Sequence, residues 1–142
     1  MNEIQKNNVL SLFINAVKAI MEEKRMNPKS LKKLNKFNAK INFGLEIEKD
    51  EYIWFNFISN NGNIQVNKGR LEDDFDLEVK SVPEDFMFFV NGEYSLLHML
   101  LRKNKYKKRK FCFGKGTTGR NLRKLIKLPS IFVMDKKRPE MR

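Results

Sequence analysis

The stretch FCFGKGTTGRNLRKL, residues 111–125, has glycines that suit either a phosphate loop or a structural turn. Gly114 and Gly119 have the spacing of the P-loop motif G-x-x-x-x-G-K-[ST]. That motif needs Lys after its last glycine to reach the phosphates, followed by Ser or Thr for magnesium. Arg120 and Asn121 occupy those positions here, and few residues follow to form the later strands of a P-loop sheet. The stretch therefore predicts a turn from a strand into a helix, without nucleotide hydrolysis.

Two helices are predicted before this strand. The segment SVPEDFMFFVNGE, residues 81–93, predicts a helix with Ser81 and Glu84 as a capping box and Gly92 at its end. The segment YSLLHMLLRK, residues 94–103, predicts a short helix rich in leucine.

The glycines separate a fifth strand, predicted over residues 107–113, from a final helix over residues 117–128. The inward-facing residues of that helix stand at helical spacing: Leu122, Leu125 and Ile126. Pro129 is predicted to end the helix, and residues 131–134 to form an apolar tail that lies over a ligand cavity or packs elsewhere.

The first part of the chain has a helical pattern. An amphipathic helix is predicted over residues 3–25, and a second helix begins with Asn27 as N-cap and Pro28 in its first turn. The buried face of the first helix follows the i, i+3, i+4, i+7 pattern: Leu10, Phe13, Ile14, Val17, Ile20 and Met21.

From Ala39 the hydrophobic period changes to two, which predicts strands. Residues 39–48 have one apolar and one polar face, so we expect that polar face to be solvated. Residues 52–59 are apolar on both faces, which favours a central strand covered at least in part on both sides. Further strands are predicted around residues 64–66 and 74–80, with NNGN as a hairpin turn.

This order of elements predicts an α+β protein with a single sheet of about five mainly antiparallel strands packed against helices. We expect one domain over residues 1–142, with a core at about 31–128, the N-terminal helix at 3–25 and a tail at 129–142.

The formal net charge of +12 indicates an anionic partner such as nucleic acid or a membrane surface. Lys far outnumbers Arg and Asn is abundant, so AT-rich codon usage is an equally good explanation of the charge. Cys112 is the only cysteine, which excludes an intrachain disulfide and fits the cytoplasm. No signal peptide or transmembrane segment is expected.

Catalytic and metal-binding groups are not assembled in the sequence. His98, the only histidine, lies between Leu97 and Met99, where we expect a packed or surface side chain rather than a base. No Cys/His spacing suits zinc. The carboxylates of EDDFDLE, residues 72–78, fit a turn and the solvated face of a strand and lack EF-hand spacing. We therefore expect no enzyme, no metal and no cofactor.

The second half resembles the sterol carrier protein type-2 domain family. The resemblance is carried by the capped helix, the second short helix, the strand ending in glycine and the closing helix. Its matching positions are Gly92, Gly114, Leu122 and Leu125, and the earlier strands also fit the sheet of that family. The resemblance covers roughly residues 31–128. It implies an apolar tunnel between sheet and helices that binds a lipid, a sterol or a fatty-acyl chain. It also implies that Gly114 is structural, where a side chain would crowd the turn.

The resemblance implies one set of expected site residues, and a basic stretch that departs from the family pattern adds a second. The lipid-contacting residues are Phe86, Phe89, Leu96, Leu97, Leu100, Leu101, Phe111, Phe113, Leu122 and Leu125. The residues expected to contact an anionic membrane or a lipid head group are Lys107, Lys108, Arg109, Lys110 and Arg120. They belong to residues 102–127, which hold twelve Lys or Arg and no carboxylate.

Two other function classes stay open at this point. Tyr106, Phe111 and Phe113, interleaved with the basic residues, would suit a module that stacks the bases of single-stranded nucleic acid. The third possibility is an interaction module that stabilises a partner enzyme.

Overall fold

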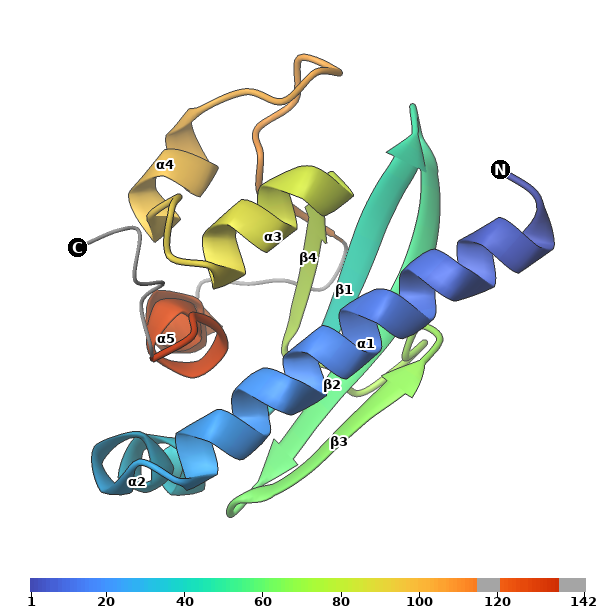
Figure 1. The fold of residues 1–142 in the computed structure, drawn as a ribbon. Coiled ribbons are helices and arrows are strands. Elements are labelled where there is room, and N and C mark those ends of the chain that lie inside the picture. The colour runs from blue at the N-terminus through green and yellow to red at the C-terminus, as the bar shows by residue number, and fades with distance from the viewer. Residues whose placement is uncertain (115–120, 136–142) are drawn as a thin grey trace.

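The computed structural model describes residues 1–114 and 121–135 and has an α+β fold (Figure 1). The helices are α1 (Glu3–Arg25), α2 (Pro28–Lys36), α3 (Pro83–Val90), α4 (Leu96–Leu101) and α5 (Leu122–Phe132). The strands are β1 (Ala39–Glu48), β2 (Glu51–Asn60), β3 (Asn63–Lys68), β4 (Leu77–Ser81) and β5 (Cys112–Phe113).

The strands form one sheet in the order β3-β2-β1-β4-β5. β4 runs parallel to β1, and the other neighbouring strands are antiparallel, so the prediction of a mainly antiparallel sheet is confirmed. The β2–β3 hairpin turns at Asn61 and Gly62, whose φ angles of 52° and 89° suit the predicted Asn-Gly turn. The sequence also places α1 correctly, and the Asn27 side chain caps α2 as predicted, accepting from the backbone N–H of Lys29 at 3.1 Å.

The core lies between the sheet and helices α1, α3 and α5, which cover one face (Figure 1). Its centre is built from aromatic rings. Phe43 stacks on Phe55 with ring centroids 5.0 Å apart, and Phe132 of α5 meets Phe43 edge-on at 5.1 Å. Phe86 of α3 joins the same cluster, 5.4 Å from Phe43. Such pairs stabilise the core beyond the burial of their area and hold α3 and α5 against the sheet.

The opposite face of β1 is buried, so the prediction of a solvated face is wrong. Asn42, Glu46 and Glu78 are at most 3% exposed. Residues 69–71 fold back over this face: Asn42 and the backbone of Leu71 exchange hydrogen bonds of 2.7 and 2.8 Å. Arg70 donates to both carboxylate oxygens of Glu78, at 2.6 and 2.8 Å. Period-two alternation locates a polar face but does not indicate that a loop covers it.

Three predicted element boundaries are also wrong. Ser81 belongs to β4, and Val82 is the N-cap of α3 without a side-chain hydrogen bond, so the Ser81–Glu84 capping box does not form. Pro129 does not end the last helix, because α5 continues through it to Phe132. The buried side chains of Leu128, Ile131 and Phe132 compensate for the backbone hydrogen bond that proline removes.

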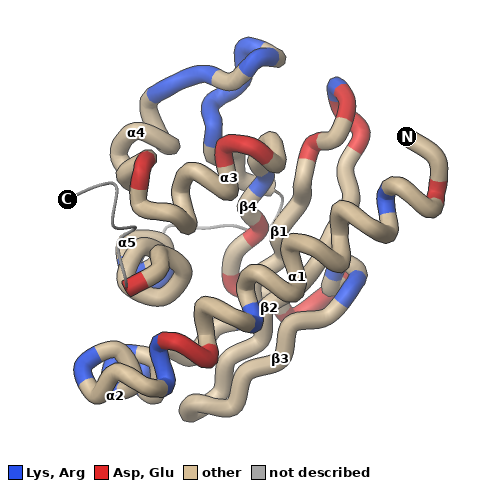
Figure 2. The backbone as a smooth tube through the Cα atoms, viewed as in Figure 1, with Lys and Arg blue, Asp and Glu red and all other residues tan. Residues whose placement is uncertain are grey.

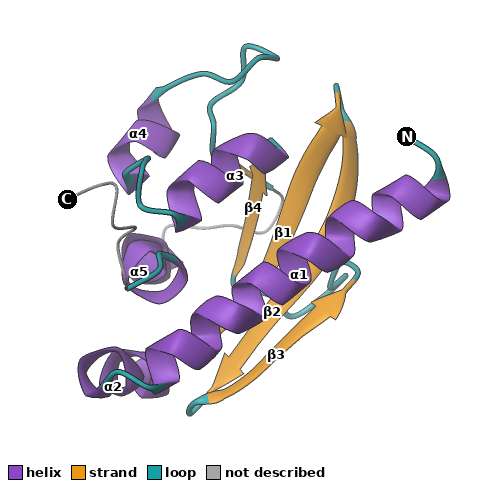
Figure 3. Cartoon of the chain, viewed as in Figure 1, coloured by secondary structure: helices purple, strands orange, loops and turns teal. Residues whose placement is uncertain are grey.

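The third wrong boundary concerns the fifth strand. Only Cys112–Phe113 pairs with β4, and residues 102–111 form a loop rich in Lys and Arg (Figures 2 and 3). We name residues 102–111 the basic loop. Lys107 has a positive φ of 65°, which is incompatible with a strand.

Gly114 follows β5 and explains part of the opening motif. A Cβ at this position would overlap the carboxylate of Glu78, so only glycine fits. Gly116, Gly119, Thr117 and Thr118 lie outside the described residues. Among the described residues, no helix is both long and apolar enough to cross a membrane.

Candidate functional site

An apolar groove of about 460 Å³ lies between α5 and the segment that joins α3 to α4. Its lining comes from the end of α3, the α3–α4 connection, α4 and the end of α5: Phe89, Gly92, Tyr94, Ser95, Leu96, Pro129, Ser130 and Val133. Its volume falls in the range of small-molecule sites. We call this hollow the α4–α5 groove.

Backbone hydrogen bonds hold the walls of the groove. Gly92, at φ 85°, ends α3, and the next two N–H groups both donate to the Phe88 carbonyl, at 2.9 and 3.1 Å. Ser95 then caps α4 through the N–H of His98. On the other side, the N–H of Met134 donates to the Val90 carbonyl at 2.9 Å and fixes Val133 beside Gly92.

The ten residues expected to contact lipid fall into three environments. The side chains of Phe86, Phe89 and Phe111 are buried in the core, at 1–2% exposure. A second set is partly buried against that core: Leu96, Leu100 and Leu125. A third set is exposed to solvent, at 39–65%: Leu97, Leu101, Phe113 and Leu122. Phe89 and Leu96 line the groove itself.

A tunnel between sheet and helices is not shown, and the aromatic rings of the core occupy that region. The hollows lie at the edges of the core and open to solvent. One of them, of about 280 Å³, lies between α1 and α3 and is also largely apolar. Its lining includes Val9, Leu12 and Met87.

Sequence reasoning missed Tyr94 and Pro129 as groove residues and placed Val133 in a tail of unassigned position. The usable signal was the apolar stripe Leu122, Ile126, Pro129 and Val133, which has helical spacing if proline is allowed inside the helix. Ile131 and Phe132, assigned to the same tail, pack in the core.

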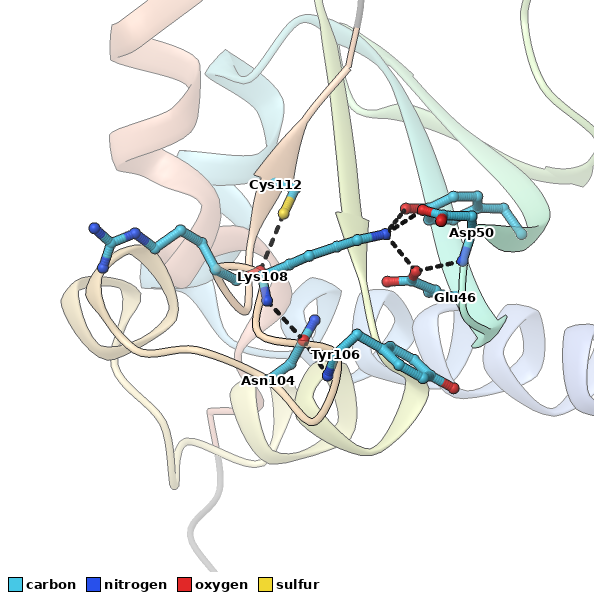
Figure 4. Close-up of polar contacts among 8 residues, drawn as sticks. Glu46, Asp50, Asn104, Tyr106, Lys108 and Cys112 are labelled. Carbon is cyan, nitrogen blue, oxygen red and sulfur yellow. Dashed lines mark hydrogen bonds and ion pairs between the residues drawn. The ribbon is translucent and has the colours of Figure 1, made fainter.

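The basic residues that were expected to contact anions differ in whether their charges are already paired within the protein. Lys108 lies against the sheet, where its Nζ contacts Glu46 at 2.6 Å and Asp50 at 2.5 Å (Figure 4). Hydrogen bonds to Asp50 and Glu46 raise the pKa of Lys108, so it stays charged and anchors the basic loop.

Lys110 is also engaged in intramolecular contacts. It pairs with Asp85 at 3.3 Å and lies over the Tyr94 ring, 4.1 Å from its centroid. Lys107 and Arg109 are exposed, as are Lys103 and Lys105 of the same loop. Arg120 lies outside the described residues.

The histidine weighed as a base and the single cysteine both lie in surroundings that indicate a structural role. His98 is partly buried beside Tyr94, with ring centroids 4.1 Å apart. Burial raises the pKa of the Cys112 thiol, which lowers its thiolate fraction at neutral pH. Within the described part of the chain, no group of acidic, histidine and cysteine side chains could hold a metal ion.

Comparison with known proteins rests on structure, because no protein-family model and no curated protein matches the sequence. Sterol carrier protein 2 from Yarrowia lipolytica, in its apo form, superposes with a TM-score of 0.55 at 16% identity, over 86% of this chain and 88% of that chain. A second crystal structure of sterol carrier protein 2 gives 0.53 at 12% identity, over 84% and 95% of the two chains. This protein has the fold of sterol carrier protein 2.

A third match extends the likeness to a bacterium. The solution structure of a conserved hypothetical protein from Thermus thermophilus, described as a possible sterol carrier protein, gives a TM-score of 0.51 at 9% identity. That match covers 87% of this chain and 90% of the other. The fold inferred from the order of elements in the second half of the sequence is therefore confirmed.

Proposed function

We propose that this protein is a non-catalytic cytoplasmic carrier that binds the hydrocarbon part of a lipid or fatty-acyl molecule in the α4–α5 groove. The observation that carries the proposal is an apolar groove, floored by the core residue Phe89, on the fold of a lipid carrier. Burying a hydrocarbon chain there would gain about 25 cal/mol for each Å² removed from water. In this proposal the groove residues Phe89, Leu96 and Val133 contact the chain.

The basic loop provides a surface for anionic membranes. Its exposed cations are Arg102, Lys103, Lys105, Lys107 and Arg109, of which Lys105 also pairs with Glu84 at 3.5 Å. Leu97 and Leu101 at the surface of α4 are 65% and 56% exposed. Attraction of about 1 kcal/mol for each basic residue near an anionic surface is sufficient for reversible docking. Lys108 and Lys110 support this surface by fixing the loop, because their own charges are paired.

Nucleic-acid binding has less support. Phe111 is 2% exposed and meets Phe89 edge-on, with ring centroids 5.0 Å apart, so it cannot stack on a base without unpacking the core. No observation favours an interaction module for a partner enzyme.

An uptake experiment tests both parts of the proposal. Delipidated protein is mixed with vesicles that carry a fluorescent fatty acid, and the signal is followed to equilibrium. We expect saturable uptake of one ligand per chain at micromolar concentration, and faster uptake from anionic than from neutral vesicles. Absence of saturable uptake would contradict the carrier function.

Charge reversal separates the membrane surface from the groove. The double variant Lys103→Glu, Lys107→Glu is expected to lose the preference for anionic vesicles and to keep the final extent of uptake. The control, Lys29→Glu with Lys32→Glu on α2, makes the same change of charge away from the basic loop. Equal loss of preference in both variants would show that only net charge matters.

A further inference from the structure

A third hollow, of about 330 Å³, lies between α2 and α5 and is lined by lysines. Lys33 and Lys36 come from α2 and Lys127 from α5, and the lining is completed by Ser130 and Ile131. Ile131 is 1% exposed and gives the hollow an apolar base. We call it the lysine hollow.

The charges of this hollow are not balanced within the described residues. None of Lys33, Lys36 and Lys127 makes an ion pair with a carboxylate of residues 1–114 or 121–135, in contrast to Lys24, Lys108 and Lys110. Three ammonium groups around one concave site repel one another and create a positive potential.

Helix electrostatics explain only part of this arrangement. Lys33 and Lys36 are in the last turn of α2, where the helix dipole favours cations. The helix dipole does not explain the position of Lys127 beside Lys33 and Lys36, because Lys127 lies in the middle of α5. A bound anion would turn the repulsion among the three into charge-assisted hydrogen bonds.

The lysine hollow and the α4–α5 groove meet at one residue. Ser130 lines both, because α5 lies between α2 and the α3–α4 pair (Figure 1). Pro129 and Val133 face the groove, whereas Lys127 and Ile131 face the lysine hollow. A ligand that crosses α5 at Ser130 would therefore contact apolar side chains in the α4–α5 groove and ammonium groups in the lysine hollow.

We infer that the lysine hollow binds the anionic head group, a carboxylate or a phosphate, of a ligand whose hydrocarbon chain occupies the α4–α5 groove. This inference rests on the proposed function and narrows the ligand class to anionic single-chain lipids. Neutral sterols and acyl esters would lack the head-group contacts.

Matched ligands test the inference. Affinities of the delipidated protein are measured for hexadecanoic acid and hexadecyl phosphate, and for methyl hexadecanoate and hexadecanol, which share the chain without the charge. We expect the anionic ligands to bind about tenfold more tightly, as charge-assisted contacts provide. The triple variant Lys33→Gln, Lys36→Gln, Lys127→Gln is expected to lose that difference and to keep its affinity for the neutral ligands.

The control variant removes the same charge elsewhere, at exposed lysines of α1 and α2: Lys18→Gln, Lys29→Gln, Lys32→Gln. It should keep the preference for anionic ligands, and thermal unfolding checks that both triple variants are folded. An unchanged preference in the Lys33, Lys36, Lys127 variant, or no preference in the wild type, overturns the head-group assignment while leaving the carrier function intact. Failure of all four alkyl ligands to bind overturns both.

A final comparison distinguishes a lipid head group from a free anion. Inorganic phosphate is titrated alone and as a competitor of hexadecyl phosphate. We expect it to bind far more weakly than the alkyl phosphate. Comparable affinity would identify the lysine hollow as an independent phosphate site and overturn the proposed link to the groove.

Discussion

Val133→Trp is expected to weaken binding of a fluorescent fatty acid by at least about tenfold, the equivalent of about 1.4 kcal/mol. Val133 is partly buried, lines the α4–α5 groove and lies beside Gly92, where an added Cβ would be 3.5 Å from its Cγ1 atom. An indole at this position fills space that the hydrocarbon chain needs. The measurement is a fluorescence titration of delipidated protein, with displacement by unlabelled fatty acid.

A matched variant identifies the groove that is used. Leu12→Trp places the same ring in the apolar hollow between α1 and α3, at a side chain that is 62% exposed. It should leave the affinity within about twofold of the wild type, within the usual effect of a surface substitution. If Leu12→Trp weakens binding and Val133→Trp does not, the ligand occupies the other hollow and the assignment is wrong.

Asp135→Ala is expected to lower the free energy of unfolding by about 3 kcal/mol, since it leaves a buried charge without its partner. Lys24 is 1% exposed, and its Nζ lies 2.8 Å from Asp135. Ser30 also donates to Asp135, at 2.7 Å, so one carboxylate connects α1 and α2 to the segment after α5. Urea denaturation measures the free energy of unfolding. A decrease below about 1 kcal/mol, the usual limit for an exposed ion pair, would contradict the prediction.

The same carboxylate predicts a pH dependence. Burial alone would raise the pKa of Asp135, but hydrogen bonds from Lys24 and Ser30 and the charge of Lys24 outweigh it and hold the pKa below its ordinary value. A carboxylate with a depressed folded pKa contributes stability above its unfolded pKa of about 3.9 and loses that contribution as the pH falls through the folded pKa. In Asp135→Asn the free energy of unfolding should therefore fall less steeply as the pH drops below about 4. The exposed control Asp73→Asn should not, and identical acid profiles for the two variants would contradict the prediction.

Local signals are sufficient for much of the fold. The amphipathic face of α1, the Asn27 cap and the Asn61-Gly62 turn depend on neighbouring residues, and the structure confirms each of them. The order of elements in the second half of the chain is sufficient to indicate the fold as a whole.

The errors come from tertiary contacts that local patterns do not contain. Pro129 is tolerated inside α5 because core packing on both sides of it holds the helix. The basic loop is not a strand because Lys108 forms ion pairs with Glu46 and Asp50, which are distant in sequence. Glu78 is buried because Arg70 reaches it from the loop after β3. The resemblance implied a tunnel between the sheet and the helices, but the phenylalanines of α3 fill that interior and leave grooves at its edge, because apolar density does not distinguish a filled core from a cavity.

Paramagnetic NMR directly measures the position of the hydrocarbon chain in the protein. Protein with labelled Leu and Val methyl groups is titrated with a fatty acid that carries a nitroxide near the end of its chain. We predict strong broadening of the methyl signals of Leu96 and Val133, with those of Val9 and Leu12 unaffected. Broadening centred on Val9 and Leu12, or none at all at saturating ligand, would contradict a carrier site between α4 and α5.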